Sequence, residues 1–447
     1  MRRAMHLDQT AATMRQVTAR LLPLLLGLYF VAYIDRVNVG IAALQMNADL
    51  NFGDATFGFG AGIFFVGYAL FEIPSNMILA HVGARRWLAR IAITWGLLTC
   101  AMLAVRTPTQ FYAARFALGV AEAGLFPGII YYLSQWFPES HRARALAGFM
   151  IASPLAQVIG GPVGGVLLSL RGAAGLAGWQ WLFLIEGLPA VVLGGIALYW
   201  LDDRPAEATW LTPAQRTWLS ERITGEARGA GVEGESPLRA LANPLAWALA
   251  IPWFAGYTTS YAYTLWVPTI VRESLKTSDA VTGLVVGAVA LTGAIAYPLS
   301  GILSDRWGER CYVAALGMGC GALGCLCVAL LVGSPLRFAG LIGCSLMTAF
   351  VQPSLWSLPT RFVRGPSAAA AIALINAVGS SGGFFGPSLV GLSRKFGGDA
   401  GAFYALATLC LAGCVWFIAL RRVKSFQRGV GTAEAGPGEL PVVQRAT

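Results

Sequence analysis

Two charged residues stand side by side within an apolar stretch near the start of the chain. Residues 28–44 read LYFVAYIDRVNVGIAAL, with Asp35 and Arg36 near the centre. Arg115 and Glu122 lie seven residues apart in another apolar stretch, so a helix would place them two turns apart on one face. A charge at the middle of a membrane helix costs about 2.5–3.5 kcal/mol. These four residues are therefore candidates for a functional charge network.

An arginine and buried carboxyl groups can together bind an anion and carry protons. The planar fork of Arg36 matches a carboxylate and does not lose its charge, so we expect Arg36 to bind a substrate carboxylate. The proton affinity of a carboxyl group depends on burial and on nearby cations, so Asp35 and Glu122 are expected to carry protons. Arg115 could pair with either acid in one state and release it in another. The alternative is a network that only fixes packing, although buried ion pairs are weak evidence for stability.

The composition indicates that a membrane surrounds these charges. Of 447 residues, 56% are hydrophobic and 12% are charged, about half the charged share of a soluble domain. The net charge of +10 comes from basic residues scattered between apolar runs, which argues against a nucleic-acid partner. The eight cysteines form no metal-binding pattern, so neither a metal nor a cofactor is expected. The three histidines and the lack of an HExxH motif argue against an enzyme.

Twelve apolar segments have the length of a membrane crossing, which takes about 20 residues. Their approximate limits are 21–45, 56–80, 87–105, 109–136, 144–170, 180–201, 245–270, 280–303, 311–333, 337–360, 367–391 and 401–420. The sequence therefore predicts an all-α integral membrane protein with twelve transmembrane helices.

The one long connection divides these segments into six and six. The predicted parts are a cytoplasmic N-tail at 1–20, a six-helix bundle at 21–201, a cytoplasmic linker loop at 202–244, a second six-helix bundle at 245–420 and a cytoplasmic C-tail at 421–447. A short amphipathic surface helix is expected near 213–228.

The distribution of basic residues predicts the orientation in the membrane. With both termini in the cytoplasm, 23 of the 32 Lys and Arg residues fall on the cytoplasmic side and seven on the outside, with two within spans. This imbalance follows the positive-inside rule. We expect a multi-pass protein of a bacterial-type inner (plasma) membrane with both termini cytoplasmic.

Two similar loops indicate that the halves repeat. SNMILAHVGARRW at 75–87 follows the second span, and SGILSDRWGERC at 300–311 follows the eighth. Half-chain repetition is typical of secondary transporters, in which two similar bundles enclose a site near the middle of the membrane.

The second loop resembles a family motif. GILSDRWGER at 301–310 is similar to the loop motif of the major facilitator superfamily, whereas the first copy has Ala80 in place of the aspartate. That departure resembles the anion:cation symporter family, as do YIDRVNVGIAAL, FEIPSNMIL, RFALGVAEAGLFPGIIYYLSQWFP and GWQWLFLIEGLPA in the first half. The most similar branch is that of tartrate-type transporters, with hydroxyphenylacetate and phthalate permeases nearby.

This resemblance implies two pseudo-symmetric six-helix halves and proton-coupled import of a small organic acid anion by alternating access. A tartrate-like hydroxy dicarboxylate is the expected substrate, and a monomer is expected to suffice. By position in the family pattern, Tyr33, Tyr68, Gln157, Trp356 and Asn376 resemble substrate-binding residues.

Other charged residues have different expected roles. Asp305, Arg306 and Arg310 in the second loop are expected to brace neighbouring helices in the outward-facing state, as a gating charge network, rather than to touch the substrate. Glu72 in FEIPSN and Glu186 in LIEGLPA are expected to have structural roles.

Two alternatives remain open at this point. Trp356 and the segment YTTSYAYTLW at 257–266, a candidate gating segment, could instead suit an aromatic carboxylate of the hydroxyphenylacetate or phthalate kind. GGPVGG at 160–165 is similar to a motif of proton-coupled exporters, although its spacing is one residue short.

Overall fold

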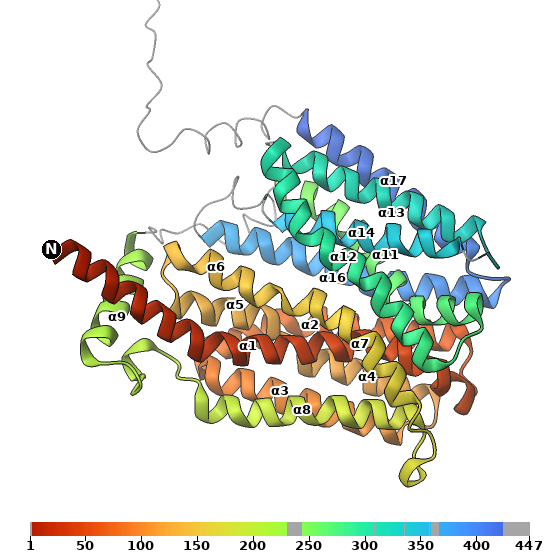
Figure 1. The fold of residues 1–447 in the computed structure, drawn as a ribbon, viewed down its shortest axis with the longest axis horizontal. Helices are drawn as coiled ribbons and strands as arrows, with labels where there is room; N and C mark the ends of the chain where they lie inside the picture. The colour runs from red at the N-terminus through yellow and green to blue at the C-terminus, as the bar shows by residue number, and fades with distance from the viewer. Residues whose placement is uncertain are drawn as a thin grey trace, which may run out of the picture.

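Long apolar helices account for nearly all of the structure, because a chain in lipid must satisfy its backbone hydrogen bonds within each segment. The computed structural model describes residues 2–229, 244–307, 309–334, 336–356, 358 and 366–422. Over these residues the chain is helical, with turns and short 3₁₀ segments as connections and no strand. Figure 1 shows the helices running roughly parallel across the molecule.

An N-terminal bundle contains the first eight α-helices. They are α1 (Arg2–Asp49), α2 (Asp54–Val82), α3 (Ala84–Ala101), α4 (Pro108–Glu122), α5 (Leu125–Trp136), α6 (Glu139–Met150), α7 (Ala152–Leu168) and α8 (Gly178–Trp200). Beyond them, α9 (Pro213–Gly229) coincides with the surface helix predicted near 213–228. Its Leu219 is fully buried while most of its other described side chains are exposed or partly exposed.

A C-terminal bundle contains the remaining helices that the structure describes. They are α11 (Pro244–Leu275), α12 (Asp279–Trp307), α13 (Arg310–Leu330), α14 (Arg337–Trp356), α16 (Pro366–Lys395) and α17 (Ala400–Arg421). Across the described residues, ten helical stretches are long and apolar enough to span a membrane. The long helices α11 and α16 pack against each other and complete two sets of six spans. Within the described residues, all twelve predicted segments thus lie on helices, and the all-α fold is confirmed.

Two of the predicted spans are each broken into two helices. The segment predicted at 109–136 ends its first helix at Glu122 and restarts at Leu125, with Gly124 at φ 87°, a backbone conformation that favours glycine. The hydroxyl of Ser75 donates to the carbonyl of Ala123 at 2.6 Å, so the break leaves this carbonyl satisfied. The segment predicted at 144–170 is likewise divided, at Ile151.

The two bundles touch most closely at one end of the molecule. We call this the far end, where α1 ends and α2 begins, and the opposite end the α9 end (Figure 1). A methyl group on Gly161 of α7 would lie 2.7 Å from the carbonyl oxygen of Gly283 on α12, and one on Gly58 of α2 would lie 2.5 Å from that of Pro387 on α16. Backbones in such contact require glycine, so the far end is tightly closed.

Candidate functional site

The central charged contact of the N-terminal bundle joins Arg36 on α1 to Glu122 on α4. The Nε of Arg36 donates to Oε1 of Glu122 at 2.6 Å, and Nη2 contacts the same oxygen. The two side chains are 6% and 0% exposed. Glu122 is the last residue of α4, where the helix dipole disfavours a negative charge. Arg36 therefore supplies the positive charge that this buried carboxylate needs.

Aromatic rings enclose the Arg36 guanidinium on its other sides. Its central carbon lies 4.9 Å from the ring centroid of Tyr68, 5.5 Å from that of Tyr33 and 5.6 Å from that of Phe64. A cation over an aromatic face is stabilised most when water is excluded. These rings therefore help to keep Arg36 charged inside the bundle.

The second charged pair is looser. Asp35 lies beside Trp95 and Thr99 of α3, and Arg115 is the cation that acts on it most strongly. One carboxylate oxygen of Asp35 is buried without a hydrogen-bond partner among the described residues. Arg115 is 1% exposed, and its Nη2 donates a long hydrogen bond of 3.5 Å to the carbonyl of Ala61. Asp35 and Arg36 thus take different partners, as their adjacent positions on a helix require.

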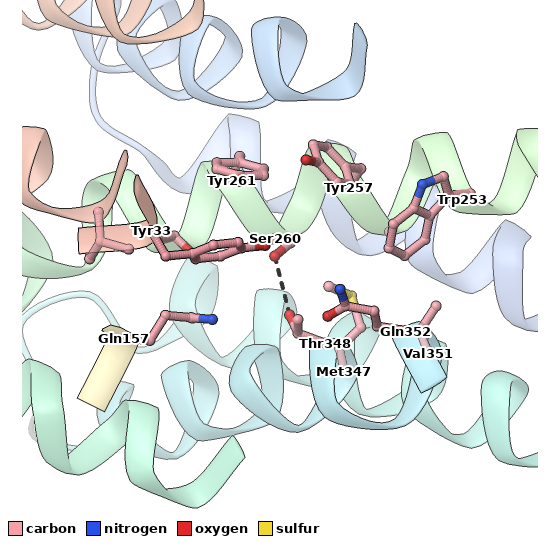
Figure 2. Close-up of a pocket in the computed structure, with 13 residues that line it drawn as sticks. Tyr33, Gln157, Trp253, Tyr257, Ser260, Tyr261, Met347, Thr348, Val351 and Gln352 are labelled. Carbon is pink, nitrogen blue, oxygen red and sulfur yellow. Dashed lines mark hydrogen bonds between the residues drawn. The ribbon is translucent and has the colours of Figure 1, made fainter. Parts of the chain in front are cut away.

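A cavity lies next to this network, between the two bundles, with about 540 Å³ of empty space that includes space open to solvent (Figure 2). The N-terminal bundle contributes α1 and α7, and the C-terminal bundle contributes α11 and α14. The lining residues are Tyr33, Val37, Gln157, Trp253, Gly256, Tyr257, Ser260, Tyr261, Thr264, Met347, Thr348, Val351 and Gln352. None of these carries a charge, so the lining offers hydroxyl, amide and aromatic groups while the charges lie behind it.

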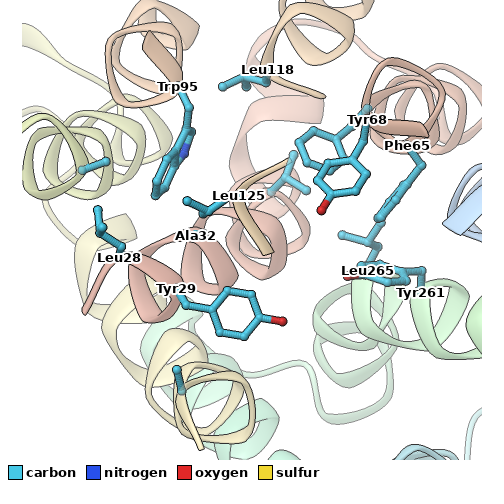
Figure 3. Close-up of a cluster of buried hydrophobic side chains, with 14 of the residues drawn as sticks. Leu28, Tyr29, Ala32, Phe65, Tyr68, Trp95, Leu118, Leu125, Tyr261 and Leu265 are labelled. Atoms are coloured by element: carbon cyan, nitrogen blue, oxygen red, sulfur yellow. The ribbon is translucent and has the colours of Figure 1, made fainter. Parts of the chain in front are cut away.

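Hydrogen-bonding side chains are arranged around the cavity from both bundles. The hydroxyl of Thr348 donates to that of Ser260 at 3.2 Å, drawn as a dashed line in Figure 2. Gln157, Thr348 and Gln352 also line a neighbouring cavity of about 370 Å³. On the side of Arg36, the rings of Phe65 and Tyr261 meet with centroids 4.3 Å apart, linking α2 to α11 (Figure 3).

The residues predicted to bind substrate do not all face this cavity. Tyr33 and Gln157 line it, and Tyr68 covers Arg36. Trp356 packs edge-on against the lining residue Trp253, at 5.5 Å between ring centroids. Asn376 instead donates from Nδ2 to Oε1 of Glu72 on α2, at 2.7 Å.

Several lining residues were not predicted as substrate contacts. Ser260, Tyr257 and Tyr261 belong to the polar and aromatic segment 257–266, for which only a gating role was expected. Thr348 and Gln352 on α14 were missed, although an amide in an apolar helix directly before Pro353 is a visible signal.

The predicted gating residues lie apart from this site. Arg306 is exposed near the end of α12, and Arg310 begins α13. The side chain of Asp305 lies outside the described residues. The structure therefore places this loop at the α9 end, away from Arg36 and Glu122.

Comparisons with known proteins agree with this architecture. The sequence model of the Major Facilitator Superfamily matches residues 25–387 and 271–444. An Agrobacterium vitis protein named "Putative tartrate transporter" is 44% identical over 423 residues, 93% of this chain and 92% of that protein. An Acinetobacter baumannii protein named "Quinolone resistance transporter" is 40% identical over 419 residues, 92% of this chain and 95% of that protein.

The fold is also that of solved membrane transporters. A bacterial homologue of the human lysosomal transporter Spinster, solved in an inward-facing and unoccupied conformation, superposes with a TM-score of 0.71 at 19% identity, covering 93% of this chain and 97% of that one. Such low identity supports the fold alone, whereas the family match spans most of the chain. The chain belongs to the Major Facilitator Superfamily and is a multi-pass membrane protein of that transporter family.

Proposed function

We propose that this protein imports a small organic acid anion together with protons, by alternating access of a central site to the two sides of the membrane. The observation that carries this proposal is the buried Arg36–Glu122 ion pair beside an uncharged cavity. A tartrate-like hydroxy dicarboxylate is the first candidate substrate, supported by the relative that bears the name of a tartrate transporter at 44% identity.

The pairing of Arg36 suggests how proton and anion binding are linked. Glu122 occupies the guanidinium fork that a substrate carboxylate would use. A proton bound by Glu122 removes the charge of this competitor, so Arg36 becomes free to bind the incoming carboxylate. The core then keeps the same net charge, because each added negative charge arrives with a proton. Burial of an uncompensated charge would otherwise be costly.

The second pair can act in the same way. Among the described residues Arg115 bonds the carbonyl of Ala61 rather than a carboxylate, and Asp35 has an oxygen without a hydrogen-bond partner. A proton on Asp35 would relieve the cost of that buried charge, and approach of Arg115 would replace the proton. Asp35 and Glu122 are accordingly the two proposed proton carriers, with Arg115 as the partner that shifts between them.

The proposed contacts of the substrate beyond its carboxylate come from the cavity lining. Gln157, Ser260, Thr348 and Gln352 offer donors and acceptors that suit hydroxyl groups. Tyr33, Tyr68, Trp356 and Asn376 remain predictions for this role. Asp305, Arg306 and Arg310 remain predicted gating residues.

The orientation completes the proposal. If the basic loops face the cytoplasm, the α9 end is cytoplasmic, and both termini lie inside a bacterial-type inner membrane. The closed far end then faces outward, so separation of the bundles at the α9 end would release the substrate to the cytoplasm. A monomer holds the whole site within the described residues, in agreement with a monomeric working unit.

Two alternatives have specific support. The aromatic side chains Trp253, Tyr257 and Tyr261 in the lining would suit an aromatic carboxylate. The relative named as a quinolone resistance transporter, at 40% identity, favours proton-coupled export of a drug. A fluoroquinolone also carries a carboxylate that an arginine could bind, so the dependence of uptake on an inward proton gradient, rather than the role of Arg36, separates the two directions.

The test is uptake of labelled tartrate into proteoliposomes with and without an inward proton gradient. Unlabelled 4-hydroxyphenylacetate, phthalate and a fluoroquinolone serve as competitors. We expect uptake to follow the gradient, Arg36→Ala to abolish it, and Arg36→Lys to lower it at least about tenfold, because lysine keeps the charge but loses the fork. Uptake that does not depend on the proton gradient, or that persists in the Arg36→Ala variant, would overturn the proposal.

A further inference from the structure

Four carboxyl groups are buried in the N-terminal bundle, and one of them differs from the others in its partner. The four are Asp35, Glu72, Glu122 and Glu186. Glu122 pairs with Arg36 of the same bundle, Glu186 accepts from the amide of Asn38 on α1, and Asp35 faces α3 and Arg115. Glu72 alone has its hydrogen-bond donor, Asn376, in the C-terminal bundle.

This contact connects the C-terminal bundle to the charged site. Glu72 is 8% exposed and lies one helical turn beyond Tyr68, the ring closest to the Arg36 guanidinium. Arg36 is the charged side chain that acts on Glu72 among the described residues, and Asn376 is its side-chain donor from α16. Besides Glu122 and the adjacent Asp35, Arg36 thus has Glu72 within its electrostatic reach, and Glu72 is the one that the C-terminal bundle holds.

The two amide–carboxyl pairs respond differently to relative motion of the bundles. Asn38 and Glu186 belong to one bundle and stay together when the bundles move. Asn376 and Glu72 belong to different bundles and must separate. A carboxylate that loses its donor in a dry environment is costly until it gains a proton or a cation. Within the described residues, the cation that acts on Glu72 is Arg36, which lies against the ring of Tyr68 one helical turn away.

We propose that Glu72 is a further coupling residue, which the Asn376 amide holds away from Arg36 in this state and releases to compete with the substrate carboxylate when the bundles separate. This inference rests on the proposed function. It replaces the structural role that the sequence alone suggested for Glu72. In this scheme the position of the C-terminal bundle determines how strongly Arg36 holds its anion.

Transport kinetics provide a first test, with two matched substitutions. Glu72→Gln removes the competing charge at constant size, so tartrate should bind more tightly while its release slows. We expect both KM and kcat for tartrate uptake to fall, each by at least about fivefold, the lower range of coupling between sites. Glu186→Gln is the control, because its amide partner lies in the same bundle, and it should leave both constants within about twofold. Equal effects of the two substitutions, or a Glu72→Gln variant with unchanged KM, would overturn the proposal.

A second test requires no substrate. Spin labels at His81→Cys and Arg422→Cys, two exposed positions at the ends of α2 and α17, report the distance between the bundles at the α9 end. Asn376→Asp places a second carboxylate against Glu72, so the distance distribution should shift to longer values at neutral pH and return at acidic pH, when one carboxyl is protonated. The double variant Glu72→Gln/Asn376→Asp restores an amide–carboxylate pair and should restore the wild-type distribution.

The two tests separate the inference from the function on which it rests. Wild-type protein that takes up no acid but shows the Asn376→Asp shift and its rescue would refute the proposed transport and retain the bundle contact. Wild-type uptake with no shift in Asn376→Asp, or with no rescue in the double variant, would refute the role of Glu72 and leave proton-coupled import standing.

Discussion

The cores of the two bundles are built from different chemistry. The N-terminal bundle buries four carboxyl groups and two arginines among its helices. In the described part of the C-terminal bundle, the buried ion pair is Arg337–Asp399 at 2.6 Å, near the far end. Deeper in that bundle the polar contacts are neutral, such as Thr259 with Cys410 at 3.2 Å.

This difference indicates that the two bundles have different roles in the movement between them. Charges that pair within one bundle remain satisfied when the bundles move, whereas charges divided between bundles would be exposed to lipid or left unpaired in each cycle. The neutral bundle can therefore move against the charged one at low electrostatic cost. Near the site, the hydrogen bond from Asn376 to Glu72 differs from these contacts, because it joins a carboxylate of one bundle to a side chain of the other.

The largest expected effect comes from placing a charge in the neutral core. Cys344 on α14 is 0% exposed and lies 3.7 Å from the sulfur of Cys325. Cys344→Asp would bury an unpaired carboxylate, at a cost of several kcal/mol. We expect loss of folded protein, measured as the monodisperse fraction in size-exclusion chromatography. Cys344→Ser should retain it. If the Asp variant folds as well as the Ser variant, the core of the C-terminal bundle accepts a buried charge, and the proposed difference between the two cores is wrong.

Removing one charge from the charged core should change coupling rather than folding. In Glu122→Gln, Arg36 is free for a carboxylate without any proton. We expect exchange of tartrate across the membrane to persist, while accumulation loses the contribution of the proton that Glu122 carries. For one coupled proton, a gradient of one pH unit corresponds to about a tenfold accumulation, which this variant should lose. Accumulation equal to that of the wild type would assign the proton to another group.

The glycine contacts between the bundles can be tested with one methyl group. Gly161→Ala would place a methyl 2.7 Å from the carbonyl oxygen of Gly283, whereas a methyl at Gly195 on α8 meets no atom within 4 Å. We expect Gly161→Ala to lower transport turnover several-fold through poorer closure of the far end. Gly195→Ala should leave turnover unchanged and could add up to about 1 kcal/mol of helix stability. Equal turnover in both variants would show that close backbone contact is not needed.

The smallest effect is expected at the rim of the far end. Asp54 on α2 bonds Arg394 on α16 at 3.0 Å, but Arg394 also binds Glu273 and Asp399 of its own bundle. The Asp54 side chain is 36% exposed, so Asp54→Asn should cost about 0–1 kcal/mol. A change in turnover below about fivefold that disappears at high salt is expected. A larger effect that salt does not alter would make this pair part of the closure itself.

The arrangement of spans could be predicted from sequence because lipid imposes a simple rule. An apolar run of about 20 residues can satisfy its backbone only as a helix, and within the described residues all twelve predicted runs lie on helices. The break after Glu122 was missed, although AGLFPG at 123–128 carries both Gly124 and a proline. The carbonyl of Ala123 at this break accepts a hydrogen bond from Ser75, a residue nearly fifty positions earlier. No local sequence pattern reveals that contact.

The candidate site, too, could be predicted from the sequence only in part. The sequence by itself determined that Asp35, Arg36, Arg115 and Glu122 lie deep within apolar spans, because depth follows from the helical rise along the chain. It did not determine their pairing, and the tertiary structure alone decided that Arg36 faces Glu122 while Asp35 faces α3. It also decided that Asn376 bonds Glu72 across the bundles. Pairing depends on how helices are rotated and packed, which is set by contacts between distant segments rather than by spacing within one of them.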